Sequence, residues 1–168
     1  MSWMPQERRK VRFNMKLDEL INKVDDIAVN SGALTSLDFF ELAQMFFKQE
    51  NVKEKILDLN RDRLYIESTN NNGLYLPPYA DKTAKHKRRV GLPDKRYTYY
   101  ETGATHESLE LFVFDDSAMV APGENAPSSA CLLDASAWGI TDEQYDEEVR
   151  DTLLEFVQDK LKDYLTNG

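Results

Sequence analysis

Residues 141–168 read TDEQYDEEVRDTLLEFVQDKLKDYLTNG, a pattern typical of one long amphipathic helix. Thr141 and Gln144 have the spacing of a capping box, and Asp142 and Glu143 favour the positive end of the helix dipole. The apolar residues recur every three or four positions and define one stripe: Tyr145, Val149, Leu153, Phe156, Val157, Leu161 and Tyr164. We therefore predict a terminal helix that buries this stripe against the rest of the protein.

The N-terminal part of the chain is also predicted to be helical. An arm without periodicity is expected over residues 1–13, followed by helices over Met15–Val29, Leu37–Gln49 and Val52 to about Ile66. The helix over Leu37–Gln49 has apolar residues on more than one face. It either lies in the core or presents aromatic rings to a partner, and burial preferences favour the core. Asn51 and Glu54 predict a capping box for the next helix.

Strand signals lie in the middle of the chain. The residues Asp81–Arg89 have helical character, and Gly91 and Pro93 end that segment. Strands are expected over Arg96–Glu101, Leu109–Phe114 and Ala118–Ala121, the last two joined as a hairpin. Residues 14–168 are thus expected to form a single α+β domain, with N-terminal helices, a small antiparallel sheet with a hairpin and a long C-terminal helix.

Composition limits the class of protein. Hydrophobic residues make up 41% of the 168 residues and charged residues 30%, which indicates a globular chain and not a disordered one. The single cysteine, Cys131, excludes an internal disulfide framework, and its apolar neighbours predict an inert buried thiol. No apolar stretch approaches the length of a membrane span, and no apolar region follows the N-terminal charges as in a secretory signal. A soluble intracellular product is expected.

Charge is distributed unevenly. The chain has a formal net charge of -9, yet Lys82–Arg96 contains seven basic residues and one acid. Residues 141–168 contain nine acids against three basic residues. Such polarity can attract a second copy of the chain or an oppositely charged neighbour, and two solvated faces are the alternative.

Tyrosines flank the basic run, and this mixture defines a candidate interaction site. Its residues are Tyr79, Lys85, Lys87, Arg88, Arg89, Lys95, Arg96, Tyr97 and Tyr99. Arginine and lysine beside tyrosine suit contact with a nucleic-acid backbone, with occasional base stacking. They suit docking on an acidic surface of a neighbouring subunit equally well. A solvated loop is the third alternative.

Catalytic patterns are weak in this chain. The residues from His106 to Glu110 resemble a zinc-protease motif in part, but Glu110 stands where the second histidine is needed. A divalent ion could be held by Glu101, His106, Glu107 and Glu110, although a solvated turn is favoured. The sequence contains no phosphate-binding glycine loop, and Ser108 lacks a nucleophile-elbow setting. We therefore expect no enzyme activity, no cofactor and no metal.

Five short elements follow one another over about half of the chain. They are Leu59-Asn60-Arg61-Asp62-Arg63-Leu64-Tyr65, then Gly73 with Tyr79-Ala80-Asp81-Lys82-Thr83, then Lys87 to Pro93, then Glu101-Thr102-Gly103 leading into Ser108–Phe114, and Gly139-Ile140-Thr141-Asp142-Glu143. In order and spacing these elements resemble a group of tailed-bacteriophage virion proteins, many of them from phages of Bacteroidetes hosts. One element departs from the group, because Ala104-Thr105-His106 follows Gly103 where an acid and aromatic residues are usual.

The resemblance implies a virion structural protein of the neck, head–tail connector or tail-completion type. Such a protein would form a cyclic ring with copies of itself, contact portal and tail proteins, and let DNA pass without specific binding. The opposed charges suit head-to-tail contacts, and the N-terminal arm and the loop Pro122–Pro127 could bridge neighbouring subunits. A small DNA-binding or nucleic-acid-processing accessory protein that uses the same basic run is the alternative.

Overall fold

The computed structural model describes residues 39–114, 118–127 and 135–167. The predicted N-terminal arm, the helix predicted over Met15–Val29 and Cys131 lie outside these residues. The predicted α+β class is confirmed. In chain order the elements are α2 (Phe39–Phe47), α3 (Glu50–Asp62), the π-helical turn η1 (Arg63–Glu67), α4 (Asp81–Arg89), α5 (Ala104–Glu107), β1 (Leu109–Val113), β2 (Ala118–Pro122), the 3-10 turn η3 (Ala135–Ala137), α6 (Asp142–Glu148) and α7 (Arg150–Asn167).

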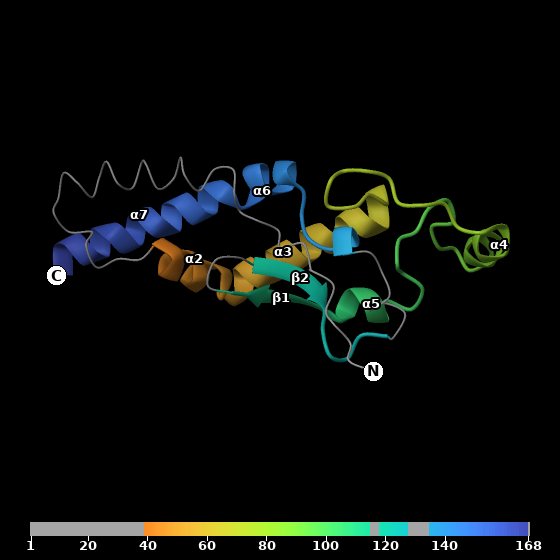
Figure 1. Ribbon diagram of the computed structural model, residues 1–168, viewed down its shortest axis with the longest axis horizontal. Coiled ribbons are helices and arrows are strands. Elements are labelled where there is room, and N and C mark those ends of the chain that lie inside the picture. Colours follow the sequence, from red (N-terminus) through yellow and green to blue (C-terminus); the bar gives the residue numbers. More distant parts are fainter. Residues whose placement is uncertain (1–38, 115–117, 128–134, 168) are drawn as a thin grey trace, which may run out of the picture.

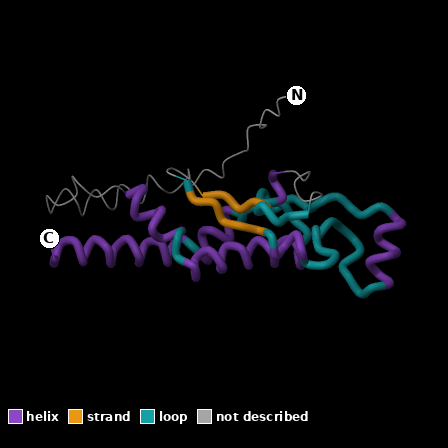
Figure 2. The backbone as a smooth tube through the Cα atoms, turned by 90° about the horizontal axis from the view of Figure 1, so that it is seen from below, coloured by secondary structure: helices purple, strands orange, loops and turns teal. Residues whose placement is uncertain are grey.

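The described part of the molecule is elongated. Helix α7 and helix α2 lie side by side at one end, α3 and the hairpin occupy the middle, and α4 lies alone at the other end (Figure 1). A view turned by 90° shows the same separation between α4 and α7 (Figure 2). The basic segment therefore lies at one end of the molecule, and the acidic segment runs from the middle, at α6, to the other end along α7 (Figure 1).

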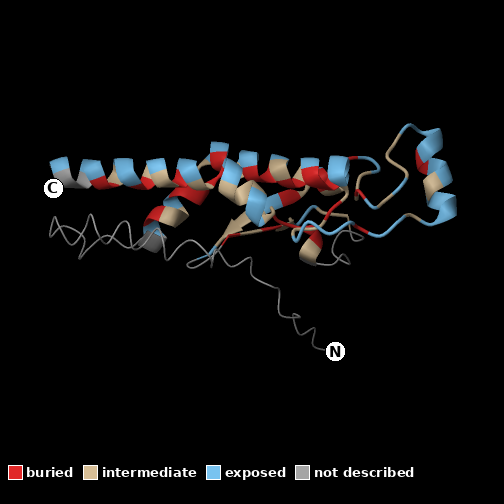
Figure 3. Ribbon diagram, turned by 90° about the horizontal axis from the view of Figure 1, so that it is seen from above, coloured by how far each residue is buried: buried red, intermediate tan, exposed pale blue. Residues whose placement is uncertain are grey.

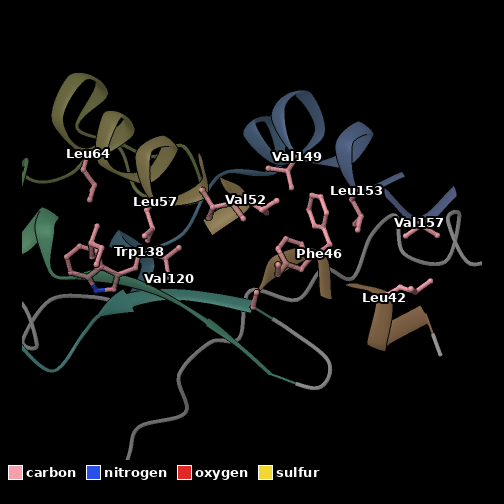
Figure 4. Close-up of a cluster of buried hydrophobic side chains, with 14 of the residues drawn as sticks. Leu42, Phe46, Val52, Leu57, Leu64, Val120, Trp138, Val149, Leu153 and Val157 are labelled. Atoms are coloured by element: carbon pink, nitrogen blue, oxygen red, sulfur yellow. The ribbon is translucent and has the colours of Figure 1, made fainter. Parts of the chain in front are cut away.

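The core joins α2, α3, the hairpin and α7 (Figure 4). Most of the stripe predicted for the C-terminal helix is buried, at Val149, Leu153, Val157 and Leu161. Tyr145 and Phe156 are half-buried, and the Tyr164 side chain is not among those that the structure describes. Burial raises the pKa of Tyr145 to about 12. Helix α2 inserts Leu42, Phe46 and Phe47 into the core, which confirms the preferred interpretation of that segment.

The C-terminal segment forms two helices instead of one. The capping box is confirmed: the Gln144 amide donates to Thr141 Oγ1 and the Thr141 amide donates to Gln144 Oε1, both at 3.1 Å. Val149 separates α6 from α7 because its φ of -118° departs from the helical range. Backbone hydrogen bonds still cross the junction, from Val149 to Tyr145 and from Leu153 to Val149, both at 3.0 Å. The predicted long C-terminal helix is confirmed in α7, which begins at Arg150, whereas the residues from Asp142 to Glu148 form the separate helix α6.

The capping box predicted for α3 was also wrong. Only two residues separate α2 from α3, so α3 begins at Glu50 with Gln49 as its N-cap and without a side-chain cap. The amides of Val52 and Lys53 donate to the Gln49 carbonyl at 3.1 and 3.0 Å. Asn51 consequently lies inside the helix.

The hairpin is confirmed, and the strand predicted before it is absent from the structure. Strands β1 and β2 pair antiparallel, with Leu109 opposite Pro122 and Val113 opposite Ala118. Of the segment Arg96–Glu101, only Arg96 makes a β-bridge, with Pro78. Tyr99 has a φ of +54°, a left-handed conformation that bends the chain and stops an extended strand.

Candidate interaction site on the α4 projection

Residues 76–100, which we name the α4 projection, carry α4 away from the rest of the molecule (Figure 3). Two antiparallel limbs connect α4 to the body. The Tyr97 amide donates to the Pro77 carbonyl at 3.0 Å, and the Tyr79 amide donates to the Lys95 carbonyl at 3.4 Å. At the far end Gly91 has a φ of +75°, which reverses the chain after α4. The predicted interaction residues from Tyr79 to Tyr99 all lie on this projection.

Lys87 is the most buried cation of the predicted set, with 3% of its surface exposed. Its Nζ donates to the Tyr100 carbonyl and lies 4.8 Å from the centroid of the Tyr79 ring. A carbonyl oxygen and a ring face both stabilise a buried ammonium group. Lys87 therefore holds α4 against the base of the projection and is not presented to a partner.

The tyrosines connect the projection to the core. The Tyr79 hydroxyl accepts a hydrogen bond from the Thr98 amide at 3.1 Å. The Tyr79 and Tyr97 ring centroids are 4.6 Å apart, and the Tyr97 ring stacks on the Tyr99 ring with 5.9 Å between centroids. The Tyr99 ring packs in turn against the core residue Trp138, with 5.6 Å between the ring centroids. These rings pack against one another in sequence, which explains a run of tyrosines that forms no strand.

His106 is buried beneath the projection. Its Nε2 lies 2.8 Å from the Thr98 carbonyl, which can only accept, so Nε2 carries the proton. The Tyr100 ring packs edge-on against the imidazole, with 5.2 Å between the ring centroids. Burial lowers the pKa of His106, the hydrogen bond to Thr98 partly opposes that change, and the nearby charge of Arg61 lowers the pKa further.

The metal-ligand set considered from the sequence is not brought together. His106 faces Thr98, whereas Glu101 lies 3.5 Å from His86. The expectation of a solvated turn was wrong for His106, because its side chain is buried in helix α5. Among the described residues no group of three or more His, Cys, Asp or Glu side chains could hold a metal ion.

Three cations of α4 share one exposed face. Lys82, Lys85 and Arg89 are spaced at i, i+3 and i+7, opposite the buried Lys87. None of the three makes an ion pair with another residue of the described chain. We name them the α4 basic face. Such a cluster attracts an anionic surface.

Two of the remaining predicted cations, Arg88 and Arg96, have intramolecular partners. Arg88 donates through Nε to Asp94 at 2.7 Å. Arg96 donates to the Leu76 carbonyl at 3.0 Å, and its guanidinium lies 4.7 Å from the centroid of the Tyr75 ring. Lys95 is exposed.

A buried polar cluster joins the first and last elements of the resemblance. Asn60 Nδ2 and Arg63 Nη2 both donate to the Gly139 carbonyl, at 2.7 and 2.9 Å. Arg63 also donates to the carbonyls of Ala137, at 2.8 Å, and Thr69. Burial lowers the pKa of Arg63 to about 10. The sequence analysis missed this role, because a buried arginine and an exposed one give the same sequence signal.

Comparison with known proteins identifies no relative: no family model, curated protein or solved structure matches this chain. Within the described residues, none of the helices combines the length and the apolar character needed to cross a membrane.

Proposed function

We propose that this chain is a structural subunit of a tailed-phage virion and forms part of the neck or head–tail connector ring around the DNA channel. The resemblance over Leu59–Glu143 supplies the class of protein. The observation that carries the proposal is the α4 projection, a protruding element tied to the core through Tyr79, Lys87 and Tyr99 and ending in an exposed basic face. A rigid protrusion loses little conformational freedom when it docks on a neighbour, which favours a role in assembly.

The charge of the whole chain supports a channel-lining role. A net charge of -9 repels the phosphate backbone, so duplex DNA can pass without adhering. The α4 basic face then serves contacts between subunits, where it meets acidic protein surface and not nucleic acid. Copies of the chain and the portal and tail proteins are the proposed partners.

The first experiment is quantitative mass spectrometry of purified virions. We expect the chain at a low integer ratio to the major capsid protein, on the order of six or twelve copies per particle, as cyclic symmetry requires. Absence from the virion would overturn the structural role. Hundreds of copies would contradict a ring at the head–tail axis.

A triple substitution tests the projection directly. Lys82→Glu, Lys85→Glu and Arg89→Glu together invert the α4 basic face and leave the buried Lys87 in place. We expect a folded protein that is no longer incorporated into particles. The matched control is Lys82→Arg, Lys85→Arg and Arg89→Lys, which keeps the charge and is expected to assemble normally. Incorporation of the inverted variant at the wild-type level would contradict the proposed contact.

A DNA-binding accessory protein is the second candidate. The observation that favours it is Tyr75, which is 70% exposed beside Arg96, an arrangement suited to base stacking next to a phosphate contact. A gel shift of single-stranded or duplex DNA that weakens steeply with salt would support this candidate. Lack of any shift at low salt would exclude it.

A further inference from the structure

Helices α6 and α7 carry an acidic residue at every fourth position for six repeats. These residues form what we name the acidic stripe: Glu143, Glu147, Asp151, Glu155, Asp159 and Asp163. All six are exposed, and they lie opposite the buried stripe that begins at Val149. The exposed edge of α7 runs along the molecule in Figure 3.

The acidic stripe is only partly neutralised within the molecule. Acids four residues apart are neighbours on a helix surface and repel one another. Arg150 lies 3.3 Å from Asp151, and Lys162 lies 3.2 Å from Asp159. The other four acids make no ion pair with any residue that the structure describes.

Helix α3 provides a contrast. It also has an acid at every fourth position, and its own cations neutralise most of them: Lys53 lies 3.6 Å from Glu50, and Arg61 lies 3.5 Å from Glu54 and 2.8 Å from Asp58. Three of the four α3 acids are therefore neutralised inside the protomer, whereas four of the six acids of the acidic stripe retain charge that a cationic surface can stabilise.

We infer that the acidic stripe of one copy binds the α4 basic face of a second copy. The inference rests on the proposed function, because it names the neighbouring subunit as the partner. Complementary charge is the first argument: α4 carries three cations without an ion pair among the described residues, and the acidic stripe carries six acids, four of them without one. Distance is the second argument, since α4 and α7 lie at opposite ends of the molecule in both views (Figures 1 and 2) and cannot meet within one protomer.

The charges on the two faces are spaced over similar lengths of helix. Lys82 and Arg89 are seven residues apart, about 10 Å along a helix that rises about 1.5 Å per residue. Asp151 and Asp159 are eight residues apart, about 12 Å, with the unpaired Glu155 between them. Three cations can therefore approach three acids along two helices. The short-range pairs that Arg150 and Lys162 make with the stripe are exposed and exchange readily for a partner's cations.

This contact is heterologous. Each copy uses its α4 basic face on one neighbour and its acidic stripe on the other, so the contact repeats and either closes into a ring or continues as a filament. Head-to-tail assembly follows from the positions of the two faces.

Charge exchange between the two faces is the test. The first variant is Lys82→Glu, Lys85→Glu and Arg89→Glu, and the second is Asp151→Lys, Glu155→Lys and Asp159→Lys. Sedimentation of the full-length chain gives the oligomer mass at about 50 and 500 mM salt. We expect wild-type oligomers that weaken with salt, at least a tenfold loss of association in each variant alone, and recovery when the two variants are mixed or combined in one chain. Circular dichroism confirms that each variant folds.

The matched control is Glu50→Lys, Glu54→Lys and Asp58→Lys, which makes the same change of net charge on α3. This variant is expected to associate like the wild type. Equal loss in this control, failure of the mixed variants to recover, or a wild-type chain that stays monomeric at low salt would each overturn the inference. Binding of DNA to the α4 basic face without any oligomer would also overturn it.

The outcomes separate this inference from the proposed function. Recovery by charge exchange in a chain that is absent from virions would support the contact and refute the virion role. A virion protein at ring stoichiometry whose wild-type chain is monomeric would refute the contact and leave the virion role in place.

Discussion

The substitution Arg63→Met tests the buried polar cluster that joins α3 to the start of α6. Arg63 is 1% exposed, and its guanidinium donates to the carbonyls of Thr69, Ala137 and Gly139. Methionine fills a similar volume and donates no hydrogen bond. After the change Gly139 keeps the bond from Asn60, whereas the carbonyls of Thr69 and Ala137 lose the guanidinium.

The expected loss of stability follows from those two carbonyls. Each buried acceptor left without a donor costs about 1–3 kcal/mol, which gives about 2–6 kcal/mol for the pair. Removing a desolvated charge offsets part of this loss, and the lowered pKa of Arg63 shows that burial disfavours the charge. We therefore expect the free energy of unfolding to fall by about 3 kcal/mol.

Urea unfolding of the full-length chain, followed by circular dichroism, measures this change. The matched control is Arg88→Met, because the Arg88 side chain is 74% exposed and its pair with Asp94 is a surface pair. We expect a loss of less than about 1 kcal/mol in that control. If Arg63→Met lost no more than Arg88→Met at equal m-value, the assignment of Arg63 as the central donor of the cluster would be refuted.

Three further predictions concern the cap, the buried histidine and the base of the projection. Thr141→Ala removes the hydroxyl that accepts from the Gln144 backbone amide and should lower the free energy of unfolding by about 1 kcal/mol in urea. Thr152→Ala, on the exposed face of α7, should not lower it. Because burial lowers the pKa of His106, the unfolded chain binds the proton more readily. The contribution of His106 to the free energy of unfolding is therefore complete above about pH 6.5. It falls as the pH drops from there towards the folded pKa, by at most about 1.4 kcal/mol per pH unit. His106→Gln should remove this pH dependence from the unfolding free energies that urea titrations give between about pH 7.5 and 5. Lys87→Met should increase amide hydrogen exchange across the α4 projection, while Lys85→Met should leave it unchanged, and equal exchange in the two variants would contradict the role given to Lys87.

Features that depend on local pattern were predictable from the sequence. The buried residues of α7 follow a helical period, and the cap formed by Thr141 and Gln144 depends on residues three positions apart. The hairpin needs only two apolar runs and a short connection between them. In each case the information lies within a few residues of the structure that it determines.

Features that depend on distant partners were not predictable. Lys87 and Lys85 have the same sequence signal, and only the approach of Tyr79 and the Tyr100 carbonyl shows that Lys87 is buried. The partners of Arg63 at Ala137 and Gly139 lie 74 and 76 residues further along the chain. The tyrosines near Thr98 fit a strand by propensity, but ring packing and one left-handed residue give them a different path. Burial of a polar side chain is a tertiary property, and composition does not encode it.

The buried cluster around Arg63 also bears on how the two proposed docking faces work together. Helix α3 and η1 lead into the α4 projection, and Gly139 leads into α6 and α7, so the bonds from Asn60 and Arg63 to Gly139 join the base of one face to the base of the other. In a heterologous assembly the angle between a subunit's two faces decides whether the contact closes into a ring or continues as a filament. A polar cluster with fixed bond directions sets that angle more sharply than apolar packing, which tolerates sliding. In the ring that we propose, closure would give a physical reason for an arginine and an asparagine in the interior at this point.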